Sequence, residues 1–215
     1  MTEGSRAKKV IGAIYSGAAK RLYEPVVVRT AFPLLGGDLN DLVLEQGRRA
    51  VAAAEGRPIL DMPIGTAYFT LAMAKRHPGL VVGVDIAAGM VRKARDAAAQ
   101  AGLTNLNAVQ GDAHSLPFPS GTFGAILCTN GLQVMPGLRQ TLVELARVLD
   151  EDGRLYVSTV TLPLGGLLPR DTAERLPTVL KSERELVGAL GDEGLQVTSV
   201  GKNRLGLLIE ATKKA

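Results

Sequence analysis

The segment Pro58-Ile-Leu-Asp-Met-Pro-Ile-Gly-Thr-Ala-Tyr-Phe69 constrains the fold of this chain more than any other feature. Apolar residues lead into Asp61, a turn of small residues follows, and the pattern then predicts an amphipathic helix over Ala67–Arg76. The order strand, tight turn and helix N-terminus is typical of a nucleotide-binding crevice in a parallel α/β sheet. Such turns usually carry two or three glycines, whereas this turn keeps only Gly65. We therefore expect a crevice of this kind, built on an altered turn.

Short apolar runs alternate with helical patterns along the rest of the chain. Strands are predicted at Ile59–Met62, Leu80–Val84, Leu106–Gln110, Gly124–Thr129 and Arg154–Val160, with further helices at Ala88–Ala101 and Gly137–Leu149. Repeated units of this kind predict an α/β fold with a parallel sheet and helices on both faces. After a helix that opens at Ser182, the runs Leu195–Val200 and Leu205–Thr212 predict an antiparallel pair at the sheet edge.

The N-terminal part of the chain has a different pattern, because residues 6–55 are expected to be helical throughout. We divide the chain into a helical cap or lid, residues 1–57, and a core, residues 58–215, which together form one compact domain. The cap could pack on the sheet, lie on a membrane surface or cover the crevice as a lid, and the lid is slightly favoured. No apolar run is long enough to span a membrane, so no stable membrane insertion is expected.

Composition narrows the class of protein. Its 46% hydrophobic and 21% charged residues are typical of a soluble globular domain. The single Cys128 excludes a disulfide framework, argues against a metal–cysteine site and favours a cytoplasmic location. The net charge of +4 comes from basic residues that are spread out rather than grouped with aromatic ones. We therefore expect no nucleic-acid partner, and the oligomeric state stays open.

Three acidic residues follow three successive strands. Asp61 ends the first strand, Asp85 ends the second strand 24 residues later, and Asp112 follows the third. An acid at the end of the second strand is suited to accept hydrogen bonds from both hydroxyls of a ribose. A short acid after the third strand is suited to an adenine amino group. One such acid is weak evidence, but three at successive strand ends indicate one ligand-binding edge.

Five segments in the right order and spacing carry a family resemblance. They are Leu60-Asp-Met-Pro-Ile-Gly-Thr-Ala67 (L-D-x-G-x-G-x-G), Val82-Gly-Val-Asp-Ile-Ala-Ala-Gly-Met90 (G-V-D-x-S-x-x-M), Gly111-Asp-Ala-His-Ser-Leu-Pro-Phe118 (G-D-A-x-x-L-P-F), Phe123–Leu132 (F-D-x-V-x-x-x-x-x-L) and Arg147–Val157 (R-V-L-K-P-G-G-x-L-x-V). The chain thus resembles class I S-adenosylmethionine-dependent methyltransferases, in the small-molecule branch of ubiquinone and menaquinone biosynthesis. The resemblance implies a Rossmann-like, mostly parallel sheet of seven strands.

The resemblance also implies a role for individual residues. S-adenosylmethionine would be the cofactor and S-adenosylhomocysteine its product, and the cofactor-binding residues would be Asp61, Pro63, Gly65, Ala67, Asp85, Ile86, Met90, Asp112, Ala113, Thr129, Asn130 and one or both of Tyr15 and Tyr23. Asp85 would hold the ribose, and Ile86 and Met90 would sandwich the adenine. Leu132 and Gln133 would border the acceptor. No metal ligand is implied.

The departures from the family pattern bear on catalysis. Pro63 replaces a glycine and loses a backbone N–H, and Ala67 adds a methyl group at another glycine position. No catalytic base can be named, since His77 is expected at a surface helix end and His114 in a structural or solvent-facing position. Alignment alone can support methyl transfer, because the sulfonium carbon is already activated.

We therefore expect a methyltransferase that acts on a small, apolar acceptor by C- or O-methylation. The turn fits a nicotinamide dehydrogenase less well, because it lacks G-x-G-x-x-G. The fourth strand also lacks the Asn/Asp-Pro-Pro-Tyr run of amino-group methyltransferases that act on nucleic acids. The alternative is a protein on the same scaffold that no longer transfers methyl groups: a cyclase, a pseudoenzyme or a binding module.

Overall fold

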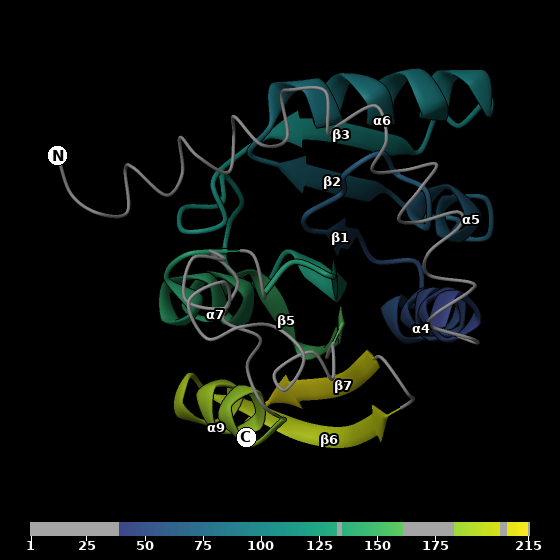
Figure 1. Cartoon of the computed structure of the whole chain (residues 1–215). Coiled ribbons are helices and arrows are strands. Elements are labelled where there is room, and N and C mark those ends of the chain that lie inside the picture. The colour runs from purple at the N-terminus through teal and green to yellow at the C-terminus, as the bar shows by residue number, and fades with distance from the viewer. Residues whose placement is uncertain (1–38, 133–134, 161–182, 203–205, 215) are drawn as a thin grey trace, which may run out of the picture.

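The computed structural model of the chain describes residues 39–132, 135–160, 183–202 and 206–214. Seven strands form one sheet in the order β3-β2-β1-β4-β5-β7-β6 (Figure 1). The strands are β1 Ile59–Asp61, β2 Val81–Asp85, β3 Leu106–Gln110, β4 Phe123–Thr129, β5 Leu149–Val160, β6 Leu195–Lys202 and β7 Gly206–Lys213. The helices are α4 Leu39–Ala54, α5 Thr70–Ala74, α6 Ala88–Gln100, α7 Leu138–Val148 and α9 Glu183–Asp192.

The sheet is parallel over its first five strands and antiparallel at one edge. β1 pairs with both β2 and β4, and each of these continues to a parallel outer neighbour. β7 runs antiparallel between β5 and β6. The predicted Rossmann-like fold with a C-terminal antiparallel pair is therefore confirmed.

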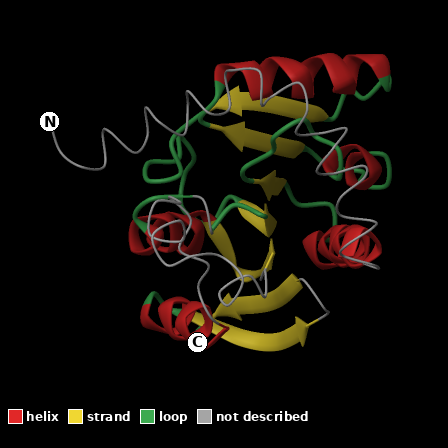
Figure 2. Cartoon of the chain, viewed as in Figure 1, coloured by secondary structure: helices red, strands yellow, loops and turns green. Residues whose placement is uncertain are grey.

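Helices cover both faces of the sheet, as Figure 2 shows in red and yellow. α4 and α5 lie on one side, and α7 and α9 lie on the other (Figure 1). The core on the first side contains small residues of three helices, among them Ala50 of α4, Ala74 of α5 and Ala94 of α6. The core on the second side is rich in leucine, including Leu142 and Leu145 of α7 and Leu190 of α9. Small side chains allow helix and sheet to approach closely, whereas leucines bury more apolar area.

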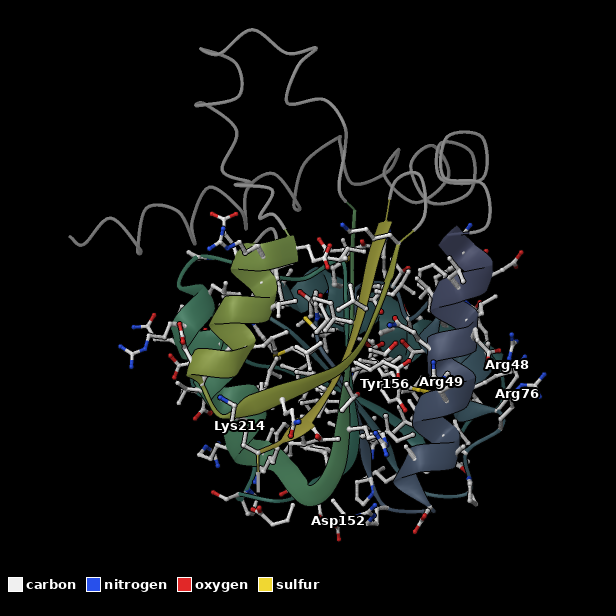
Figure 3. All side chains as sticks on the ribbon, turned by 90° about the horizontal axis from the view of Figure 1, so that it is seen from below. Arg48, Arg49, Arg76, Asp152, Tyr156 and Lys214 are labelled. Carbon is white, nitrogen blue, oxygen red and sulfur yellow. The ribbon has the colours of Figure 1, made fainter. Side chains whose placement is uncertain are left out.

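Helix α4 belongs to the segment predicted as a cap, and it packs against β4 and β5. The Gln46 side-chain amide donates a hydrogen bond to the Val157 carbonyl of β5 at 3.3 Å. Arg49 forms an ion pair with the buried Glu210 of β7, and Figure 3 shows Arg49 beside Tyr156. Burial and the nearby Glu210 carboxylate raise the pKa of the Tyr156 phenol. Residues 1–38 lie outside the described part, so the lid and the division at residue 57 stay predictions.

Two local predictions are wrong. The helix after the first turn begins at Thr70 and ends at Ala74, because Ala67 has a left-handed φ of 63° that a continuous helix cannot contain. His77 is not at the surface, since it is only 3% exposed. Its Nε2 lies 2.9 Å from the Arg57 carbonyl, which explains how a buried imidazole is tolerated there.

Candidate functional site

The strand order brings the predicted acids to one edge of the sheet. β1 lies between β2 and β4, and the chain moves outward from β1 to β2 and β3 before it returns to β4. The loops that leave the carboxyl ends of β1 and β4 therefore diverge to opposite faces. In open α/β sheets, ligands bind in the crevice at such a switch point. Asp61, Asp85 and Thr129 each end one of these strands.

Asp85 ties the first turn to the end of β2. Its Oδ2 accepts a hydrogen bond from the Gly65 N–H at 3.0 Å, and its Oδ1 accepts one from the Ala87 N–H at 2.8 Å. A carboxylate oxygen can accept more than one hydrogen bond, so the buried carboxylate keeps capacity for a ligand hydroxyl. Gly65 has a φ of 56°, and a Cβ built on it would meet no atom of the described residues within 4 Å. The turn thus presents its backbone next to open space.

Asp61 is buried directly beneath this turn. Its Oδ2 accepts a hydrogen bond from the Thr70 hydroxyl at the start of α5. Its Oδ1 has no hydrogen-bond partner among the described residues and is fully buried. Burial raises the pKa of the carboxyl group to about 7; the Thr70 hydrogen bond opposes this increase, and the negative charge of Asp85 adds to it. Asp61 is therefore a buried carboxyl group at the centre of the site, with a pKa close to neutral pH.

Pro63 and Ala67, which stand at glycine positions of the family pattern, each make specific contacts in the structure. The peptide bond before Pro63 is cis, and the proline ring packs against Gly131 in the loop after β4. A Cβ on Gly131 would lie 2.4 Å from Pro63 Cδ, so only glycine fits there beside this proline. Ala67 is completely buried in spite of its left-handed backbone, and its N–H bonds to the Ile64 carbonyl at 3.0 Å.

The predicted adenine residues differ in exposure. Ile86 is 42% exposed directly after β2, and the Gln110 side-chain amide binds its carbonyl at 3.0 Å. Met90 is only 5% exposed, so it presents little surface to a ligand in this structure. The Asp112 side chain is 39% exposed beyond the end of β3, and Ala113 next to it is half-buried. An exposed apolar side chain can support a flat ring, and a carboxylate can accept a hydrogen bond from an amino group.

Two side chains of α7 fix the loop that follows Asp112. The Glu144 carboxylate accepts a hydrogen bond from the Leu116 N–H at 2.7 Å, and Arg147 donates to the carbonyls of Leu116 and Phe118 at 3.0 and 2.8 Å. The hydrogen bond from Arg147 holds the pKa of Glu144 below its usual value. The loop therefore moves with α7 rather than independently.

The end of β4 forms the other wall of the crevice. Asn130, which follows Thr129, has a left-handed φ of 52°, and its N–H bonds to the Ser158 carbonyl of β5 at 2.7 Å. Leu132 is buried and belongs to the core on the α7 side. Burial raises the pKa of the Cys128 thiol to about 12, so this thiol is not a nucleophile at neutral pH. Gln133, Tyr15 and Tyr23 lie outside the described residues.

Sequence reasoning missed Thr70 and Gly131. Thr70 supplies the hydroxyl that holds Asp61, and Gly131 makes room for Pro63. The only sequence signal for Thr70 is a hydroxyl residue shortly after the turn, and Gly131 could be found only by knowing that the two loops meet. Within the described ranges, no group of three or more His, Cys, Asp or Glu side chains could hold a metal ion. In those same ranges, no helix has the length and apolar character needed to cross a membrane.

Comparison with known proteins agrees with this geometry. Residues 59–153 match the family model described as a methyltransferase domain. The chain is similar to demethylmenaquinone methyltransferase of Deinococcus radiodurans, with 34% identity over 132 residues that make up 59% of this chain and 54% of that protein. The chain thus spans about half the length of the curated relatives that it matches.

Two solved structures share the fold at low sequence identity. Magnesium protoporphyrin IX methyltransferase of Synechocystis, solved with S-adenosylhomocysteine bound, has a TM-score of 0.79 at 18% identity and covers 97% of this chain and 100% of that one. The [4+2]-cyclase SpnF has a TM-score of 0.70 at 20% identity and covers 82% and 81%. These likenesses concern the fold alone. The family match over residues 59–153 therefore identifies a methyltransferase domain within this fold.

Proposed function

We propose that this protein binds S-adenosylmethionine at the carboxyl ends of β1 to β4 and methylates a small, apolar acceptor. The observation that carries the proposal is the pair of buried acids next to the Gly65 turn, Asp61 and Asp85, with Asp112 just beyond the end of β3. Among the described residues, a Cβ on the Gly65 turn held by Asp85 would meet no atom within 4 Å, and one buried oxygen of Asp61 has no hydrogen-bond partner. Buried polar atoms normally have a partner, so an unpaired oxygen here fits a site for a polar ligand.

The described residues fit the cofactor part by part. The backbone of Pro63–Ala67 and the Asp61 carboxylate suit the amino-acid part, which carries an ammonium group. Asp85 suits the ribose hydroxyls, the exposed face of Ile86 suits the adenine ring, and Asp112 suits its amino group. Thr129 and Asn130 then border the sulfonium, and Tyr15 or Tyr23 would complete the site from the N-terminal segment.

The cofactor supplies an activated methyl group when it is bound, and the chain's task is to align an acceptor with it. Leu132 is buried below the acceptor side, and Gln133 would lie next to it. The Cys128 thiol of β4 is not a reactive group at neutral pH, because burial keeps it protonated. This favours an acceptor whose nucleophilic atom needs no strong base. A demethylated quinone is the first candidate, because sequence relatives bear the name demethylmenaquinone methyltransferase. We place the activity in the cytoplasm, as the single buried cysteine favours.

A second candidate is a protein that binds the cofactor without transferring its methyl group. Pro63 and the left-handed Ala67 change the turn that holds the amino-acid part, and this observation favours the alternative. A cyclase with the same fold shows that the scaffold can serve other chemistry, although fold likeness alone assigns no activity.

Two measurements on the full chain separate these functions. Isothermal titration calorimetry with S-adenosylmethionine and S-adenosylhomocysteine tests the site, and mass spectrometry of a demethylmenaquinone analogue tests for a gain of one methyl group. Binding with methylation supports the proposal. Binding without methylation across quinone, porphyrin and phenol acceptors supports the alternative, and the absence of binding by either cofactor form would contradict both.

A further inference from the structure

His114 joins two loops of the proposed cofactor site that are distant in sequence. Its Nε2 lies 2.6 Å from the carbonyl oxygen of Pro136, immediately before α7. Because a carbonyl oxygen only accepts, Nε2 carries the hydrogen of this bond. His114 falls on a variable position of the pattern G-D-A-x-x-L-P-F, so the family resemblance assigns it no role.

The same residue also contacts the carboxylate assigned to the adenine. The His114 backbone N–H donates to Asp112 Oδ1 at 3.0 Å, and the ring Nδ1 lies 4.0 Å from that oxygen. The imidazole is mostly buried, and it packs against Gly137 at the start of α7. A Cβ on Gly137 would lie 2.9 Å from His114 Cε1. The position of the ring is therefore defined from both loops.

The contacts continue from Pro136 to the turn after β1. The Met135 N–H donates to the Gly131 carbonyl at 3.2 Å. A Cβ on Gly131 would lie 3.2 Å from Met135 Cε and 2.4 Å from Pro63 Cδ. A continuous series of contacts thus runs from Asp112 through His114 and the Pro136 carbonyl to the turn that would hold the amino-acid part of the cofactor.

We propose that His114 is a positioning residue that couples occupation of the adenine subsite at Asp112 to the geometry of Gly131, Met135 and Pro136, which lie between β4 and α7. This inference rests on the proposed function. When a ligand amino group fixes the Asp112 carboxylate, the backbone of residue 114 and the imidazole become fixed with it. The hydrogen bond to Pro136 then holds Met135 and Gly131, which border the acceptor side. Cofactor binding at one end of the crevice thereby orders the other end.

The rest of the loop after β3 does not depend on His114. Glu144 and Arg147 bind the backbone of Leu116 and Phe118 through three further hydrogen bonds. Removal of the imidazole therefore leaves the loop attached to α7 at those points. A variant at position 114 is expected to fold and to lose the coupling selectively.

The experiment compares His114→Leu with His114→Gln in the full chain. Leucine removes the donor, whereas the glutamine amide can still donate to the Pro136 carbonyl. The probes are S-adenosylhomocysteine and 5′-methylthioadenosine, which contains the adenosine part without the amino acid. We expect affinity for S-adenosylhomocysteine to fall about fivefold in His114→Leu, as for the loss of one neutral hydrogen bond, and to stay within about twofold in His114→Gln.

The decisive readout is hydrogen exchange at the Met135 amide, measured by NMR. In the wild type, 5′-methylthioadenosine should slow this exchange, although Met135 lies outside the adenine subsite. The slowing should be lost in His114→Leu and retained in His114→Gln. A purely structural role would lower the melting temperature without removing the response to the ligand. His114→Asn, whose shorter side chain does not reach Pro136, is a second variant and should behave like His114→Leu.

His77→Leu is the matched control, because it removes an imidazole–carbonyl contact of similar length at the opposite edge of the sheet. It should lower stability and retain the slowing of Met135 exchange. If His114→Leu keeps both the wild-type affinity and the slowed exchange, the coupling is wrong while the proposed function stands. If the wild type binds neither probe, the proposed function fails, and the coupling fails with it.

Discussion

At the amino ends of β1, β2 and β3, polar side chains bind backbone carbonyls, whereas at the carboxyl ends buried carboxylates accept hydrogen bonds from the residues that follow the strands. Arg57 and His77 lie before β1 and β2, and each contacts main-chain carbonyls at 2.9 to 3.3 Å. Asn105, before β3, contacts the carbonyls of three residues. At the other edge, Asp85 accepts two backbone N–H groups, and Asp61 has one oxygen with no partner in the part of the chain that the structure describes.

The difference separates stability from binding. At the amino edge, these side chains satisfy backbone groups that would otherwise be left unpaired on burial. The carboxyl edge contains a carboxyl group with a raised pKa and two of the three described non-glycine residues with positive φ, Ala67 and Asn130, while the third, Glu55, precedes β1. Such costly features tend to collect at functional sites, where a ligand can compensate for them. Mutations at the two edges should therefore change different quantities.

The largest expected effect is on the pH dependence of stability and concerns Asp61. Its pKa of about 7 in the folded state lies above the ordinary 3.8, so the unfolded chain loses its proton first as the pH rises. Stability contributed by the protonated form is present below about pH 4 and is lost between about pH 4 and 7. The full difference corresponds to about 4 kcal/mol.

Asp61→Asn should remove this loss. Asparagine keeps an acceptor for the Thr70 hydroxyl. Any change in the free energy of unfolding that does not depend on pH cancels when the same variant is compared at two pH values. Urea unfolding at pH 4.5 and pH 7.5 should show the variant gaining about 2–4 kcal/mol on the wild type over that interval. Asp152→Asn, at an exposed position, controls for the loss of one carboxylate. An equal pH dependence in Asp61→Asn and the wild type would show that Asp61 is not buried as described.

The next effect tests the amino edge through Asn105→Ala. The Asn105 side-chain amide lies 2.9 to 3.1 Å from the carbonyls of Ala74, His77 and Gly79, which joins the end of α5 to the start of β2. Its loss should lower the free energy of unfolding by about 2–3 kcal/mol, because buried carbonyls lose their donor. Affinity for S-adenosylhomocysteine, measured by calorimetry below the unfolding transition, should stay at the wild-type value. A large loss of affinity would erase the distinction between the two edges.

Asp85→Ala is the corresponding test of the carboxyl edge. It removes the acceptor for Gly65 and Ala87 as well as the proposed acceptor for the ribose. Affinity for S-adenosylhomocysteine should fall by about 1–3 kcal/mol, the range for hydrogen bonds to a charged group. Calorimetry on Asp85→Ala and Asn105→Ala side by side compares the edges directly. An unchanged affinity in Asp85→Ala would mean that the binding site lies elsewhere.

The sequence predicted the strands well because alternating apolar runs and strand-end acids are local signals. The prediction for Leu106–Gln110 has the observed bounds, and each of the other strands differs from its predicted bounds by one to five residues at one or both ends, most at the start of β5. The failures depend on contacts between distant segments. The burial of His77 requires the Arg57 carbonyl, and the fit of Pro63 requires Gly131. Neither partner can be recognised from local sequence.

The roles of individual site residues are predicted less fully than the fold. The three acids could be grouped because parallel strands end at a common edge, and the structure places them there. Two features could not be inferred because they depend on how the loops pack. Met90 is buried, and the Asp85 carboxylate accepts hydrogen bonds from two backbone N–H groups. Cofactor roles for all these residues therefore stay predictions, with Asp85 the first to test.

The smallest expected effect concerns the alanine that replaces a glycine in the turn. Ala67 has a φ of 63°, which costs an alanine about 1 kcal/mol relative to glycine, yet its methyl group is fully buried in the core next to α5. Ala67→Gly relieves the backbone but loses a buried methyl worth about 0.8 kcal/mol and adds chain entropy to the unfolded state. The free energy of unfolding in urea should therefore stay within about 0.5 kcal/mol of the wild type. Ala67→Val keeps the strained backbone and adds a β-branched side chain, so it should lower the free energy of unfolding by at least about 1 kcal/mol. If Ala67→Gly instead stabilised the protein strongly, the turn would hold unrelieved strain, and the alternative function as a protein that no longer transfers methyl groups would gain support.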